Sequence, residues 1–190
     1  MIKISLQFFG GRGGGGSGGA RGGGRAGGGG KPTLSGVEDS IRNNSYESAA
    51  VFDENGNMVL QKVGGDHEVR FSKADLATMK NGTFTHNHTG SGEAVSTFSA
   101  ADINLTTRSG LREMRAVEGN KTYILTKTAN KRARNSFSTD YADAMRREGN
   151  RLSLSITSNK VLSQKLTSFG SNWLKNNASK YGYTYKETTR

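Results

Sequence analysis

The stretch Thr85-His86-Asn87-His88-Thr89-Gly90 is followed by Ser99-Ala100-Ala101-Asp102. The prediction of the fold and of the functional site starts from these residues. The histidines end an apolar run, and residues i and i+2 of a β-strand point to the same side, so a strand over 83–88 presents both imidazoles to one spot. Asp102 lies in the first turn of a helix that Ser99 is expected to cap. Two nitrogens, one carboxylate and a water form the ligand set of an open, catalytic zinc site. The sequence therefore predicts that Zn²⁺ is bound by His86, His88 and Asp102.

Alternation and turn signals on both sides of this stretch predict an α+β fold, a mixed sheet flanked by helices. Asn55-Gly56 marks a hairpin turn between two strands, and Gly119 marks another. Ser35, Ser72 and Ser99 are each followed three residues later by an acidic residue, which is typical of helix starts. The strands are expected at 47–53, 58–63, 67–71, 83–88, 112–117 and 123–127, and the helices at 35–45, 72–81 and 99–110.

Residues 128–190 are predicted to form a basic, mainly helical C-terminal extension. Apolar residues recur at three- and four-residue spacing over 160–180, which predicts an amphipathic helix. Another helix is expected over 139–147, and a terminal edge strand over 181–185. Residues 121–190 carry fourteen Lys or Arg against four Asp or Glu. Such an excess is typical of nucleic-acid binding and equally of a solvated basic face, so both interpretations stay open.

The first 31 residues are predicted to lie outside the folded domain. Fifteen of residues 10–30 are glycine, and such a segment buries too little apolar surface to offset its ordering entropy, so 10–31 is expected to be a disordered linker. Residues 1–9 are apolar and end in Leu6-Gln7-Phe8-Phe9, the form of a peptide that docks into a partner's groove or sheet edge. The predicted divisions of the chain are 1–9, 10–31, 32–127 and 128–190.

The same opening residues bear on location and partners. Leu6-Gln7-Phe8-Phe9 followed by Gly10-Gly11-Arg12-Gly13 resembles the ends of proteins from tailed-phage head and portal gene clusters. The resemblance implies a portal, capsid or scaffold protein as the partner of residues 1–9, and a location in the host cytoplasm or the virion. The chain has no cysteine, which excludes disulfides and cysteine-ligated zinc. No apolar run approaches the ~20 residues of a membrane span, so no membrane partner is expected.

The order strand, helix, strand, loop, helix around His-x-His and Ser-x-x-Asp resembles the JAB/MPN (JAMM) metalloprotease family over roughly residues 47–127. The resemblance implies a cytidine-deaminase-like sheet flanked by helices. In that family the two histidines and the aspartate bind zinc, an upstream glutamate activates the water, and the serine supports the oxyanion. Matched by motif position, the ligands are His86, His88 and Asp102, and the catalytic residues are Glu47 and Ser99.

The chain departs from the family pattern at two places. Thr89 stands where the family has proline, and ten residues separate His88 from Ser99 where the family has seven. A strict count reaches Ser96, but that alignment loses the aspartate ligand, whereas a glycine-rich loop absorbs an insertion at small entropic cost. Ser-x-x-Asp is also a common capping box by itself. The identity of the glutamate rests on position, and Glu38 and Glu54 stay open as alternatives to Glu47.

The two resemblances together imply a zinc-dependent peptidase or isopeptidase that acts on a protein substrate and is tethered to a phage head or portal component. Two other classes remain. One is a non-catalytic virion or assembly protein, in which the docking peptide and linker carry the function. The other is a basic nucleic-acid-binding protein or nuclease, which the charge of residues 121–190 favours.

Overall fold

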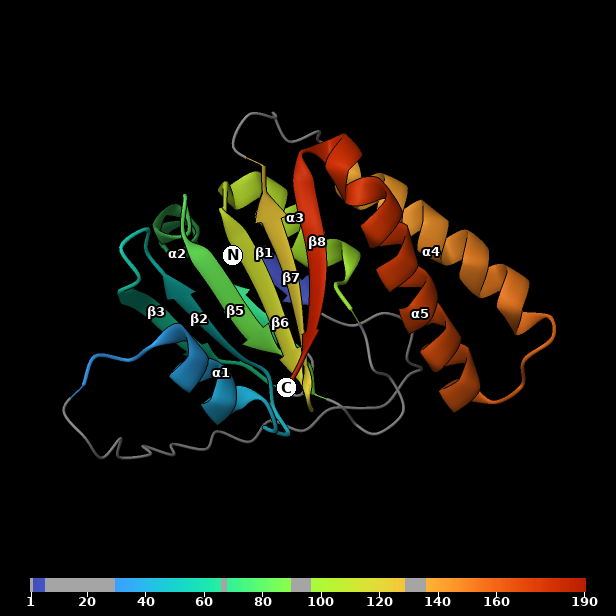
Figure 1. Cartoon of the computed structure of the whole chain (residues 1–190), viewed down its shortest axis with the longest axis horizontal. Helices are drawn as coiled ribbons and strands as arrows, with labels where there is room; N and C mark the ends of the chain where they lie inside the picture. The colour runs from blue at the N-terminus through green and yellow to red at the C-terminus, as the bar shows by residue number, and fades with distance from the viewer. Residues whose placement is uncertain (1, 6–29, 66–67, 90–96, 129–135) are drawn as a thin grey trace.

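The computed structural model describes residues 2–5, 30–65, 68–89, 97–128 and 136–190, and its main feature is a six-stranded mixed sheet flanked by helices (Figure 1). The strand order is β3-β2-β5-β6-β7-β8, and every neighbouring pair is antiparallel except β5 with β6. This confirms the predicted α+β class. The strands are β2 (Ser48–Phe52), β3 (Met58–Val63), β5 (Thr83–Asn87), β6 (Glu113–Glu118), β7 (Lys121–Lys127) and β8 (Tyr183–Thr189).

The β2–β3 hairpin forms at the predicted Asn-Gly turn. Gly56 has a φ of +79°, a left-handed conformation that glycine adopts without a steric penalty. The Asp53 carboxylate accepts hydrogen bonds from the backbone N–H groups of Asn55 and Asn57, at 2.9 and 2.8 Å. The Asp53 side chain thereby provides hydrogen-bond acceptors for turn N–H groups that have no partner on a neighbouring strand.

Helices cover both faces of the sheet. In Figure 1, α1 (Leu34–Ile41) lies on one face, and α3 (Ala100–Ser109) lies on the other. The long helices α4 (Phe137–Ser153) and α5 (Asn159–Asn177) pack on the side of α3 and lead through a 3₁₀ turn, η1 (Ala178–Tyr181), into β8. No helix in the described ranges has the length and apolar character needed to cross a bilayer.

The start of α1 corrects one sequence prediction. Thr33, rather than Ser35, caps this helix, because the Thr33 hydroxyl accepts the backbone N–H of Gly36 at 3.1 Å. Ser35 instead lies inside the first turn. Glu38, which was expected to close a capping box, directs its carboxylate to Arg115 and Thr85 in the sheet.

The C-terminal elements belong to the same sheet and core as the preceding part of the chain. Strand β8 pairs with β7 along its whole length. Phe137 and Tyr141 from α4 lie in one hydrophobic cluster with Phe84 of β5 and Met114 of β6. The predicted boundary at residue 127 therefore falls between two adjacent strands of one sheet.

The strand predicted over 67–71 does form, as β4 (Glu68–Phe71), but it does not extend the main sheet. It pairs antiparallel with β1 (Ile2–Ser5) from the chain's beginning. The rest of the predicted docking peptide, with Leu6, Phe8 and Phe9, lies outside the described residues, as does nearly all of the predicted linker over 10–31.

Gly82, at the entry to β5, marks a close approach of two backbone segments. A Cβ at this position would lie 2.5 Å from the carbonyl oxygen of Phe52 and 3.2 Å from that of Met79. The Gly82 carbonyl accepts the N–H groups of Arg112 and Glu113, at 2.9 and 3.2 Å. Gly82 thus joins β2, β5 and the beginning of β6 where no larger residue fits.

Candidate metal centre

Strand β5 brings the two predicted histidine ligands together. Successive residues of β5 alternate between the faces of the sheet, so Phe84, His86 and His88 point toward α3. The Nε2 atoms of His86 and His88 lie 3.0 Å apart. The His86 ring also contacts the Phe84 ring, with centroids 5.4 Å apart, so the pair continues an apolar surface. The predicted convergence of the two imidazoles is present in the structure.

Asp102 enters the same site from the first turn of α3, where it also closes the capping box with Ser99. The Ser99 hydroxyl accepts the Asp102 N–H at 3.1 Å, and the Ser99 N–H donates to Oδ2 of Asp102 at 2.7 Å. The other carboxylate oxygen, Oδ1, lies 3.5 Å from Nε2 of His86. The cap therefore uses one oxygen of Asp102 and directs the other to the histidines, so the capping role and the ligand role are compatible.

The geometry and the donor types of the three side chains suit a metal ion. The ligand atoms of His86, His88 and Asp102 all lie within 4.8 Å of one another. Zinc bonds of about 2.0 Å at tetrahedral angles hold donor atoms about 3.3 Å apart, close to the two contacts of His86. Among the described residues, Oδ1 of Asp102 is buried without a hydrogen-bond partner. A buried carboxylate oxygen without a donor is costly, and a cation would compensate it.

Burial favours the neutral forms of both His86 and Asp102, which suits the histidine as a metal ligand and opposes ligation by the carboxylate. His86 and Asp102 are 0 % exposed, and His88 is 5 % exposed. Burial lowers the pKa of His86 to about 3, opposed in part by the backbone of Arg115. Burial raises the pKa of Asp102 to about 6, opposed by His88 and by the hydrogen bonds from Ser99. At pH 7.5 His86 is neutral and Asp102 is ionised, which are the forms that ligate a metal.

Glu47 lies on the histidine face of the sheet. In the β2–β5 pairing Ala49 stands opposite His86, and directly opposed residues of an antiparallel pair share a face. Glu47 precedes Ala49 by two residues, so its side chain points to the same face, next to the position of His88. Its backbone continues the ladder by bonding to Gly64 and Gly65. Its side chain is buried.

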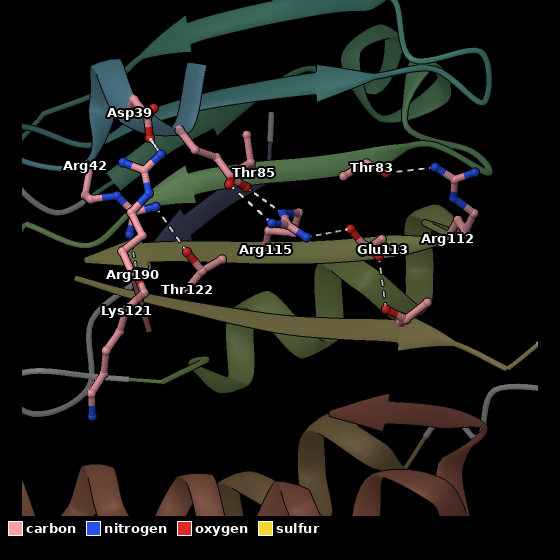
Figure 2. Close-up of polar contacts among 12 residues, drawn as sticks. Asp39, Arg42, Thr83, Thr85, Arg112, Glu113, Arg115, Lys121, Thr122 and Arg190 are labelled. Atoms are coloured by element: carbon pink, nitrogen blue, oxygen red, sulfur yellow. Dashed lines mark hydrogen bonds and ion pairs between the residues drawn. The ribbon is translucent and has the colours of Figure 1, made fainter. Parts of the chain in front are cut away.

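The two alternative glutamates lie elsewhere. Glu38 is on the opposite face, where its carboxylate accepts hydrogen bonds from Nε of Arg115 at 2.5 Å and from the Thr85 hydroxyl at 3.1 Å. Figure 2 shows Thr85 and Arg115 on neighbouring strands, with a dashed line from the Arg115 guanidinium to Glu113. Glu54 is exposed in the turn after β2. Of the three candidates, Glu47 alone shares the face of the histidines.

Asn87, between the two histidines, has a role that the sequence analysis missed. Its side chain is buried on the opposite face and accepts the Ser48 N–H at 2.7 Å. Its amide nitrogen donates to the carbonyls of Asn44 and Tyr46, at 3.3 and 3.0 Å. These bonds fix the backbone on both sides of Glu47. The period-2 alternation of the strand was the available signal, because it separates Asn87 from the ligand face.

Comparison of the chain with protein-family models, curated proteins and solved structures finds no match. What is known of the site comes from the structure alone. It shows a buried His-His-Asp group that resembles the JAMM motif, in a mixed α+β fold.

Proposed function

We propose that this chain is a zinc-dependent hydrolase of peptide or isopeptide bonds. The observation that supports this most directly is the buried His86-His88-Asp102 group, in which one carboxylate oxygen is directed toward the histidines and is not used by the helix cap. A Ser/His/Asp triad is disfavoured, because the Ser99 hydroxyl accepts the Asp102 N–H and the His86 nitrogen faces the aspartate and the other histidine.

The surrounding residues have chemistry that suits hydrolysis. A zinc ion, when bound, acts as a Lewis acid toward a carbonyl and lowers the pKa of water toward ~7. Glu47 is assigned as the general base that accepts the proton of the attacking water. Ser99 is assigned as a hydrogen-bond donor to the substrate carbonyl oxygen as that oxygen gains negative charge. Its hydroxyl hydrogen is suited to this role, since no described residue accepts a bond from it.

The experiment that tests the catalytic assignment is the substitution Glu47→Gln. The amide keeps the size of the side chain and removes its basicity, so we expect hydrolysis of a casein or linear polyubiquitin substrate to fall at least about a hundredfold. Zinc content should not change, because Glu47 is not a ligand. The matched control is Glu54→Gln, in the exposed turn, with activity equal to wild type. Full activity in the Glu47→Gln chain, with its zinc bound, would remove Glu47 from the mechanism.

The proposed setting is a tailed-phage particle or its assembly in the host cytoplasm, with a portal, capsid or scaffold protein as the partner. It is supported by the resemblance of the opening residues alone. Residues 2–5 pair with β4 of their own chain, and the proposed contact with the partner is assigned to Leu6, Phe8 and Phe9. We expect the full chain to recover phage head proteins in a pull-down and a Phe8→Ala/Phe9→Ala chain to recover them several-fold less. Equal recovery by both chains would overturn this partner.

A further inference from the structure

The segment Thr97-Phe98-Ser99, which leads into the helix that carries Asp102, is held by tyrosines from the C-terminal part of the chain. Tyr141 of α4 donates its phenolic hydrogen to the Phe98 carbonyl at 2.9 Å. The phenolic oxygen of Tyr185 in β8 lies 2.7 Å from the Thr97 hydroxyl. The rings of Phe98 and Tyr185 also meet edge to face, with centroids 6.1 Å apart. The segment is therefore fixed from two elements that are distant in sequence.

A single peptide group connects Tyr141 to Asp102. The carbonyl of Phe98 and the N–H of Ser99 belong to the same planar peptide unit. Tyr141 bonds the oxygen of this unit at 2.9 Å, and Oδ2 of Asp102 bonds its N–H at 2.7 Å. Donation to the carbonyl polarises the amide and strengthens its N–H as a donor. Tyr141 and the Asp102 carboxylate are thus hydrogen-bonded to opposite ends of one peptide group.

The position of Tyr141 is itself narrowly defined. Its side chain is fully buried, and a Cβ built on Gly170 of α5 would lie only 2.6 Å from its phenolic oxygen. Burial raises the pKa of Tyr141, and Tyr185 and Asp102 raise it further. The phenol therefore remains protonated, as a donor to the Phe98 carbonyl must be.

We propose that Tyr141 is a positioning residue for the metal ligand Asp102, acting through the Phe98–Ser99 peptide group, and that Tyr185 supports the same segment. This inference rests on the proposed metal centre. The hydrogen bond from the Ser99 N–H to Oδ2 of Asp102 requires a fixed Phe98–Ser99 peptide plane. That hydrogen bond in turn directs Oδ1 of Asp102 to the histidines. The metal centre is thus completed by residues outside the motif-bearing part of the chain. Outer partners of metal ligands typically change metal affinity 10- to 100-fold when they are removed.

The test compares Tyr141→Phe with Tyr123→Phe in the full chain. Tyr123 is the matched control, because it is a fully buried tyrosine whose hydroxyl has no hydrogen-bond partner among the described residues. Zinc affinity is measured by competition with a chromophoric chelator, ligand geometry by the visible absorption of bound Co²⁺, and stability by urea unfolding of the metal-free chain. We expect Tyr141→Phe to bind zinc at least tenfold more weakly and to change the Co²⁺ spectrum, and Tyr123→Phe to match wild type in both.

The outcomes separate this inference from the proposed function. A wild-type chain that binds no zinc overturns both. A wild-type chain that binds zinc, together with a Tyr141→Phe chain that matches Tyr123→Phe, overturns the positioning role and leaves the proposed function standing. A loss of stability with an unchanged Co²⁺ spectrum also overturns it, because that is the result of a purely structural role. If Tyr141→Phe does not fold, the same measurements on Tyr185→Phe test the inference, because Tyr185 is half-buried and supports the same segment.

Discussion

A chain carrying His86→Ala and His88→Ala is expected to bind no zinc, whereas the wild-type chain binds one ion. The double substitution removes both nitrogen donors, which lie 3.0 Å apart, and leaves only Asp102 of the predicted ligand set. Zinc at a thousand times its dissociation constant stabilises a protein by about 4 kcal/mol, and all of that stabilisation should disappear. The measurement is the zinc-dependent shift of the unfolding midpoint, together with elemental analysis of the purified chain.

In the wild-type chain, the pH dependence of the zinc-induced shift in unfolding midpoint gives a further check of the same site. A metal binds the ionised form of Asp102, whose pKa is raised to about 6. About one pH unit or more above this pKa the carboxylate is almost fully ionised, and the stabilisation by zinc is fully expressed. Below pH 6 protons compete with the metal, so zinc affinity should fall about tenfold for each further pH unit through this group.

The control for the double substitution is His67→Ala, which removes the chain's third histidine and should keep the full zinc-dependent shift. Since both chains are compared with and without zinc, a loss of intrinsic stability in the double variant does not affect the readout. Zinc retained by the double variant at wild-type stoichiometry would refute the proposed centre.

Gly82→Ala is expected to destabilise the whole fold by about 3 kcal/mol or more, at the upper end of the usual cost of overpacking. The new methyl group would lie 2.5 Å from the Phe52 carbonyl oxygen and 3.2 Å from that of Met79. Both atoms are backbone, so a rotamer change cannot relieve the contact. Either β2 moves away from β5, or the turn before β5 opens, and each movement breaks hydrogen bonds of the ladder.

The measurement for Gly82→Ala is urea unfolding, and the matched control is Gly65→Ala. Gly65 has a φ that other residues adopt, and a Cβ there meets nothing within 4 Å. The control should therefore lie within about 0.5 kcal/mol of wild type. A Gly82→Ala chain of wild-type stability would mean that β2 and β5 are spaced more widely at this point than the structure shows.

Local signals in the sequence were sufficient to predict most of the elements and the grouping of His86, His88 and Asp102. The Ser99 capping box was predicted from residues three apart, and it forms as expected. The His86-His88 pair converges because strand alternation is a property of the backbone. Each of these predictions needs information from only a few neighbouring residues.

Features that depend on distant pairing were not predictable in the same way. Nothing in residues 67–71 indicates that β4 leaves the main sheet and pairs with β1 near the beginning of the chain. The contact of Tyr141 with Phe98 joins residues 43 positions apart, and the apolar stripe of α5 has no signal for the close approach at Gly170. Such contacts are determined by how the layers pack, and the hydrophobic pattern alone does not specify that packing.

The alternation along β5 also constrains how this chain can evolve. Because each face of the strand carries a different polar system, inserting or deleting one residue within β5 would move the imidazoles toward α1 and present Thr85 and Asn87 to α3. Length changes should therefore be eliminated between Gly82 and Thr89 and tolerated directly after Thr89. Homologues should show gaps between Thr89 and Thr97 and none inside the strand.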